Sequence, residues 1–72
     1  MKQQIIDLLS EILNVPADTI TEDTNASDID RWESLNHVLI IGALEERLGI
    51  VIPLDDAVEI TSVRELLDAC RV

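Results

Sequence analysis

Aromatic residues, cysteine and histidine are nearly absent from this chain. Its 72 residues include a single tryptophan, no phenylalanine or tyrosine, one cysteine and one histidine. A lone cysteine cannot form an internal disulfide, and one cysteine with one histidine does not make a metal site, so we expect no metal. Stability must then come from aliphatic packing, because 47% of the residues are hydrophobic.

Positive charge is also scarce. Five lysines and arginines face fifteen aspartates and glutamates, which gives a net charge of −10. Nucleic-acid phosphates and anionic membrane surfaces are bound through Lys and Arg, so we expect neither as a partner. The charge favours protein partners with basic docking patches, although solubility alone is a simpler explanation of it.

The sequence contains neither a long apolar run nor a signal peptide. Its longest apolar run covers residues 38–44, and residues 1–4 lead into an amphipathic segment. We therefore expect a cytoplasmic protein without membrane insertion, in which Cys70 stays reduced. A chain of this length predicts a single domain over residues 1–72.

Hydrophobic periodicity predicts helices near the start and in the middle of the chain. Apolar residues recur at helical spacing over residues 5–13, and Asn14 is suited to end that helix. Residues 34–48 contain no proline, and Gly49 can end the second helix in a left-handed conformation. The wide apolar face of this second helix consists of Leu35, Val38, Leu39, Ile40, Ile41, Leu44 and Leu48.

Two further helices are expected in the last third of the chain. We interpret residues 50–52 as a buried connector that Pro53 ends, and residues 54–58 can form only a turn or two. The last helix begins at Ser62, where Ser62 and Glu65 fit a capping box, and Cys70 lies on its apolar side. The fold class is therefore all-α, a small four-helix bundle of three main helices plus one short helix.

A long polar segment, residues 15–33, separates the first two predicted helices. It shows no sustained periodicity, and an irregular loop of this length is usually functional. A short helical turn can form over residues 17–20. The apolar residues that could pin the segment to the core are Val15, Ile20, Ile29 and Trp32.

Ser34 stands where this segment meets the second helix. From the residues alone, the simplest interpretation is an N-cap. Alternatively, a phosphate ester on Ser34 would lie beside free N–H groups at the positive end of the helix. Ser34 and His37 could also suggest a nucleophile and its base. A hydrolase further needs an enclosed pocket and an oxyanion hole, for which this chain has little room, so we expect no enzyme.

Gly42 is an unusual residue for the middle of a helix. Glycine there costs about 0.5–1 kcal/mol relative to alanine. Either another element approaches the backbone closely at Gly42, or space is left for a ligand.

Four motifs in register resemble the acyl carrier protein family. Residues 32–37, W-E-S-L-N-H, are similar to the W-D-S-L-x-H form of the family's attachment motif, with Glu33 in place of the usual aspartate. Residues 44–50, L-E-E-R-L-G-I, are similar to the family's L-E-E-x-F-G-I. Residues 52–53 and 60–63 follow in the expected order, so the resemblance covers essentially the whole chain.

The resemblance implies that Ser34 carries 4′-phosphopantetheine donated from coenzyme A. The thiol of this arm would hold an acyl group as a thioester, in a monomeric protein that catalyses nothing itself. The implied partners are a phosphopantetheinyl transferase, an acyl- or aminoacyl-loading ligase or transferase, and a downstream acyltransferase or synthase. The residues implied to face these partners are Glu33, Leu35, Asn36, Val38, Leu39 and Gly42.

The segment between Ser34 and Leu44 contains no acidic residue, unlike that of the family's housekeeping fatty-acid carriers. This difference indicates a specialised pathway, such as polysaccharide or lipid modification or natural-product assembly. Two alternatives remain open. One is an aminoacyl or peptidyl carrier, and the other is a helical adaptor that bears no prosthetic group and binds a partner through its exposed apolar residues.

Overall fold

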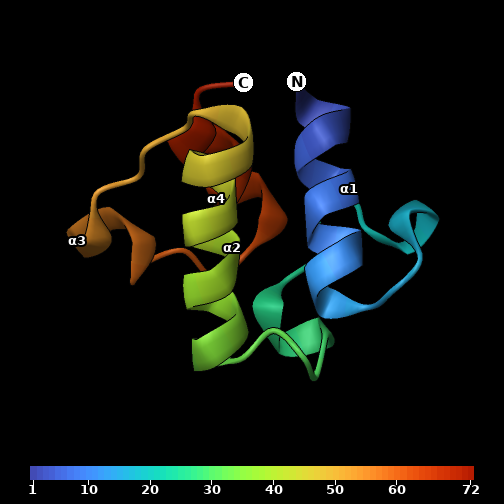
Figure 1. Ribbon diagram of the computed structural model, residues 1–72. Coiled ribbons are helices and arrows are strands. Elements are labelled where there is room, and N and C mark those ends of the chain that lie inside the picture. Colours follow the sequence, from blue (N-terminus) through green and yellow to red (C-terminus); the bar gives the residue numbers. More distant parts are fainter.

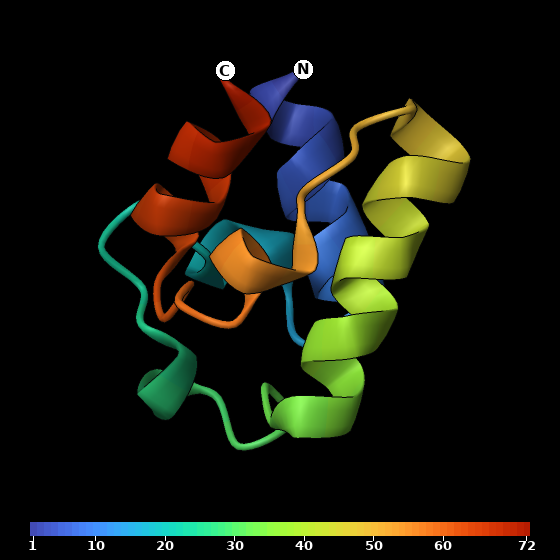
Figure 2. The ribbon, with the colours of Figure 1, turned by 90° about the vertical axis from the view of Figure 1, so that its left-hand side faces the viewer.

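Four α-helices and two short 3₁₀ helices follow one another in the computed structural model, which describes all 72 residues (Figure 1). Their bounds are Lys2–Leu13 for α1, Ala17–Thr19 for η1, Ala26–Asp28 for η2, Ser34–Leu48 for α2, Leu54–Ala57 for α3 and Val63–Cys70 for α4. α1 and α2 run antiparallel side by side, and α3 lies beside the middle of α2 (Figures 1 and 2). The predicted bundle of three main helices and one short helix is confirmed.

Aliphatic side chains from the α-helices and the long loop form one core. It contains 16 buried residues and no buried polar side chain. Each fully buried Leu, Ile or Val contributes about 1.5–3 kcal/mol relative to an exposed one. Cys70 belongs to this core, as predicted, and burial raises the pKa of its thiol. The least exposed large side chains are Ile5, Leu9, Leu13, Ile40, Leu44, Val63 and Leu66.

The helix ends follow the local sequence closely. Asn14 and Gly49 end α1 and α2 in the left-handed region, with φ of 57° and 68°, as predicted. Ser62 caps α4 by accepting a hydrogen bond from the Glu65 N–H at 3.1 Å. The predicted capping box is displaced by one residue, however, because the Glu65 carboxylate accepts from the Thr61 N–H at 2.8 Å. The hydrogen bonds from Thr61 lower the pKa of the Glu65 carboxyl.

Residues 15–33 are ordered by backbone pairing as well as by apolar contacts. The Ala26 N–H donates to the Thr61 carbonyl at 2.8 Å, and the Val63 N–H donates to the Thr24 carbonyl at 2.9 Å. These bonds join the loop to the start of α4, which no side-chain pattern indicated. The predicted short turn is η1, and the predicted pins are buried at Ile20 and Trp32 and half-buried at Val15 and Ile29.

The wide apolar face of α2 is only partly buried. Ile40 and Leu44 are fully buried, whereas Leu35, Val38 and Leu39 are 66%, 61% and 51% exposed. The family resemblance assigned these three to the partner-facing side, and this role stays a prediction.

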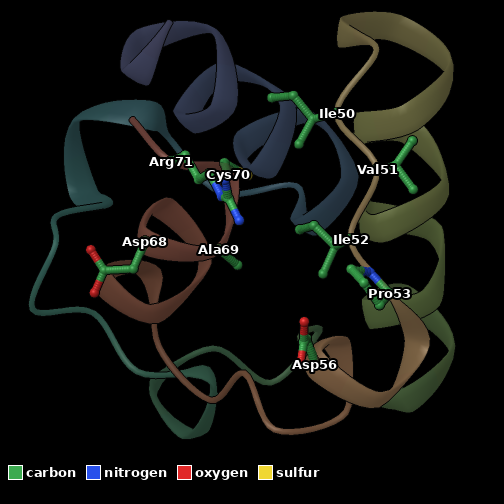
Figure 3. Close-up of a pocket in the computed structure, with 9 residues that line it drawn as sticks. All are labelled: Ile50, Val51, Ile52, Pro53, Asp56, Asp68, Ala69, Cys70 and Arg71. Carbon is green, nitrogen blue, oxygen red and sulfur yellow. The ribbon is translucent and has the colours of Figure 1, made fainter.

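The connector after α2 is buried at only one of its three positions. Ile52 is buried and Ile50 is half-buried, but Val51 is exposed. The prediction of a wholly buried connector was therefore wrong. Val51 also borders the hollow that Ile50 and Ile52 line, but the extended chain directs neighbouring side chains to opposite sides, and the Val51 side chain points the other way (Figure 3).

Candidate functional site: a serine at the start of α2

α2 begins at the end of the bundle away from both chain termini (Figure 2), and Ser34 is its first residue. Its side chain is exposed and makes no hydrogen bond within the protein. Glu33 is the N-cap instead, because its Oε1 accepts the Asn36 N–H at 2.9 Å. The interpretation of Ser34 as an N-cap was therefore wrong, and its hydroxyl is left free.

The first turn of α2 leaves two backbone donors beside Ser34. The Asn36 N–H is bonded to the Glu33 carboxylate, and the His37 N–H donates to the Glu33 carbonyl at 2.8 Å. The N–H groups of Ser34 and Leu35 have no acceptor in the protein. Unpaired amides at the positive end of a helix are favourable partners for a phosphate group.

A shallow hollow of about 250 Å³ lies beside Ser34. Its presence gives room for atoms attached to the hydroxyl. The free hydroxyl, the two unpaired amides and this space together fit a covalently bound phosphodiester arm. The hollow is lined by Ala26, Trp32, Glu33, Ser34, His37 and Ile60.

Glu33 and Asn36 hold the start of α2 in place. The Asn36 side chain is half-buried, and its Nδ2 donates to the Arg31 carbonyl at 2.6 Å. Both residues were predicted to face partners. Their polar groups also connect the loop to the helix beside the serine, and their contact with partners stays a prediction.

His37 connects the loop before Ser34 with α3. The Trp32 indole N–H donates to His37 Nδ1 at 2.9 Å, and His37 Nε2 lies 2.7 Å from the Ala57 carbonyl oxygen. An indole nitrogen only donates and a carbonyl only accepts, so these contacts require a neutral imidazole with its hydrogen on Nε2. Neither ring nitrogen is free to take a proton from Ser34. The pair is therefore not arranged as a nucleophile and its base.

The exposed apolar surface of α2 continues onto α3. Leu54 and Val58 are 71% and 68% exposed, and a cleft of about 230 Å³ separates them from α2. These two residues were not predicted to face partners, although their i, i+4 spacing places them on one side of this helical turn. The cleft is lined by His37, Val38, Ile41, Gly42, Leu54, Ala57 and Val58.

Gly42 lies on open surface. A Cβ atom added there would meet no atom within 4 Å beyond its chain neighbours and the adjacent backbone of its own helix, so the expectation of a close backbone approach was wrong. Gly42 and Val38 line both the cleft toward α3 and a second hollow of about 510 Å³ on the α1 side. The glycine therefore keeps the ridge between the two hollows low.

The largest hollow, of about 720 Å³, is unrelated to the serine. It lies between the connector after α2 and the end of α4, whose side chains border it from opposite sides (Figure 3). None of the predicted site residues lines it. In the whole chain, no group of three or more His, Cys, Asp or Glu residues could hold a metal ion. None of the helices has the length and apolar character needed to cross a bilayer.

Known families and proteins similar to this chain indicate its class of domain. The family model described as "Phosphopantetheine attachment site" matches residues 3–70. The acyl carrier protein of Syntrophobacter fumaroxidans is 34% identical over 68 residues, which cover 94% of this chain and 84% of that protein. The acyl carrier protein of a Picosynechococcus species is 38% identical over 73 aligned residues, covering 94% of this chain and 89% of that protein.

The acyl carrier protein of Lactobacillus johnsonii is 35% identical over 66 residues, covering 90% of this chain and 81% of that protein. The chain belongs to the acyl carrier protein family, as its motifs predicted. Phosphopantetheine is the prosthetic group that this domain attaches.

Proposed function

We propose that this protein carries an acyl group as a thioester on a 4′-phosphopantetheine arm esterified to Ser34. The Ser34 oxygen would attack the β-phosphorus of coenzyme A. The bond from phosphorus to the adenosine bisphosphate would break, and the serine proton would leave to the transferase or to water. The supporting observation is the exposed, unbonded Ser34 hydroxyl beside the free N–H groups of Ser34 and Leu35. In this proposal the chain itself catalyses nothing.

The proposed docking surface for partner enzymes is the apolar face of α2 and α3. It combines the exposed residues Leu35, Val38 and Leu39 with Leu54 and Val58. We call these five residues the apolar face. The centre of an interface is typically apolar and poor in charge, and this composition supports docking there.

Acidic residues follow the α2 part of the apolar face in the sequence and also lie between Leu54 and Val58. No acidic residue lies between Ser34 and Leu44, whereas Glu45, Glu46, Asp55 and Asp56 follow in sequence. A partner would therefore present apolar side chains at the centre and basic side chains at the rim. The proposed partners are a phosphopantetheinyl transferase, a loading ligase or transferase, and a downstream acyltransferase or synthase. The neutral centre favours a specialised pathway over general fatty-acid synthesis, and a cytoplasmic location stays a prediction.

The same apolar face favours a second function, a helical adaptor without a prosthetic group. The free serine hydroxyl supports the carrier, because an adaptor has no use for it. An aminoacyl or peptidyl cargo would use the same serine and the same arm. The mass of the thioester isolated from native cells distinguishes that cargo from an acyl group.

Intact mass spectrometry tests the carrier proposal. The purified chain is incubated with coenzyme A and a broad-specificity phosphopantetheinyl transferase, and we expect a stoichiometric gain of one phosphopantetheinyl group. Ser34→Ala should abolish the gain. Ser27→Ala, which changes another exposed serine of the loop region, should leave it intact. The adaptor remains if no gain occurs under conditions that modify a control carrier, and the assigned residue is wrong if the Ser34→Ala chain still gains mass.

A further inference from the structure

The only tryptophan of the chain depends on its only histidine for a hydrogen bond. Trp32 lies two residues before Ser34, its side chain is buried, and a buried N–H is costly to leave unpaired. His37 Nδ1 supplies the acceptor from the first turn of α2, and the two rings stack with centroids 6.2 Å apart. Trp32 and His37 therefore hold each other across the start of the helix.

α3 has few attachments of its own. It is a single turn, Leu54–Ala57, and helices this short do not form without tertiary contacts. Among all side chains, only that of His37 forms a hydrogen bond to α3, through the Ala57 carbonyl at 2.7 Å. This carbonyl also accepts from the Ile60 N–H at 3.2 Å, so His37 provides the shorter of its two bonds.

The Trp32 bond controls the bond to Ala57 through the imidazole tautomer. A donor on Nδ1 keeps that nitrogen unprotonated, so the single ring hydrogen stays on Nε2, where it faces the Ala57 carbonyl. His37 also lines both the hollow beside Ser34 and the cleft between α2 and α3. The His37 side chain thus connects Trp32 to α3.

We propose that His37 is a positioning residue that couples the serine loop to α3, so that the Ser34 site and the α2–α3 cleft are held as one unit. Displacing Trp32 would allow the imidazole hydrogen to lie on either ring nitrogen. This change would weaken the hydrogen bond to the Ala57 carbonyl and destabilise α3. Leu54 and Val58 belong to α3 and the residue after it, so a change at the serine loop would alter the exposed apolar surface. This inference goes beyond the carrier function and does not depend on it.

Amide hydrogen exchange in the unmodified chain tests the coupling. Trp32→Phe keeps an aromatic ring in the core and removes the N–H donor, together with part of the ring volume. We expect the Val58 and Ile60 amides, which donate to the Leu54 and Ala57 carbonyls, to exchange about fivefold faster, as loss of one neutral hydrogen bond predicts. The amides in the middle of α1 and α4 should keep their rates. The ¹⁵N shifts of the imidazole should show the hydrogen on Nε2 in the native chain and a mixture of tautomers in the variant.

A matched control separates coupling from packing. Ile41→Val trims another residue of the same cleft and should leave the exchange of α3 unchanged. His37→Gln is the second variant, to be used if Trp32→Phe speeds exchange in every helix, and it should again act on α3 selectively. The proposal is overturned if neither variant changes the exchange of α3 selectively, or if the native imidazole carries its hydrogen on Nδ1. Neither result bears on whether Ser34 is pantetheinylated.

Discussion

Glu33 and Ser34 have different roles at the start of α2. Glu33 satisfies a backbone donor of the first turn, and Ser34 keeps its hydroxyl in solvent. Glutamate is not among the preferred N-cap residues, which have shorter side chains. Here its additional methylene still allows a 2.9 Å bond to the Asn36 N–H. Replacing the family's usual aspartate by Glu33 therefore leaves the helix start capped.

Substitutions of Glu33 and Ser34 should have different effects on the free energy of unfolding. Glu33→Ala removes the cap and should lower the free energy of unfolding by about 0.5–2 kcal/mol. Ser34→Ala removes a hydroxyl without a partner and should change the free energy of unfolding by less than about 0.5 kcal/mol. Glu33→Gln keeps an acceptor oxygen and serves as the control. Urea unfolding followed by circular dichroism gives these values, and a larger loss in Ser34→Ala than in Glu33→Ala would contradict the assignment of the cap.

At the scale of the helix, Gly42 inside α2 and Gly49 at its C-cap are in opposite situations. Gly42 has ordinary helical geometry and open space around it, whereas Gly49 ends the helix with φ of 68°. Alanine fits the first position, where glycine costs conformational entropy. At the second position any Cβ is strained in the left-handed region. The fold therefore requires Gly49 but does not require Gly42.

Alanine substitution should stabilise the protein at Gly42 and destabilise it at Gly49. Gly42→Ala should raise the free energy of unfolding by about 0.5–1 kcal/mol, and Gly49→Ala should lower it by about 1–2 kcal/mol. If the low ridge at Gly42 serves docking, Gly42→Ala should also raise the KM of the phosphopantetheinyl transferase for this chain. Thermal unfolding and initial rates measure both effects. A stabilised variant with an unchanged KM would leave Gly42 without a role in docking to the transferase.

Across the whole molecule, most acidic side chains form no ion pair. Of the fifteen acidic residues, three take part in ion pairs, namely Glu11 with Arg47, Glu22 with Lys2 and Arg64, and Asp23 with Arg64. The hydrogen bond from Lys2 lowers the pKa of the Glu22 carboxyl, and the hydrogen bond to Asp23 raises the pKa of Arg64. The other twelve acids repel one another across a small surface, which destabilises the folded state.

Added salt should therefore stabilise the protein. Screening weakens the few surface ion pairs, which contribute about 0–1 kcal/mol each, but it weakens the more numerous repulsions as well. We expect the melting temperature to rise steadily with sodium chloride concentration. The double variant Asp55→Asn, Asp56→Asn should show a smaller rise. A melting temperature that falls or stays constant with salt would refute this account of the surface.

Features that depend on neighbouring residues could be predicted from the order of the amino acids. The helices could be located because apolar spacing follows the helical period. Their ends at Asn14, Gly49 and Ser62 could be found because capping involves residues only a few positions apart. The family could be recognised because its motifs are short and keep their order along the chain.

Features that join residues distant in sequence became visible only in the folded chain. The pairing of Ala26 with Thr61 and the bond from His37 to the Ala57 carbonyl join positions 35 and 20 residues apart, and no local pattern marks them. The division of α2's apolar residues into buried and exposed sets depends on where α1 and α3 pack against it. Ser34 could be singled out from its motif, but its free hydroxyl became apparent only once Glu33 was seen to occupy the cap. The local sequence pattern specifies which side chains are apolar enough to be buried. The packing of distant elements determines which of these side chains are buried.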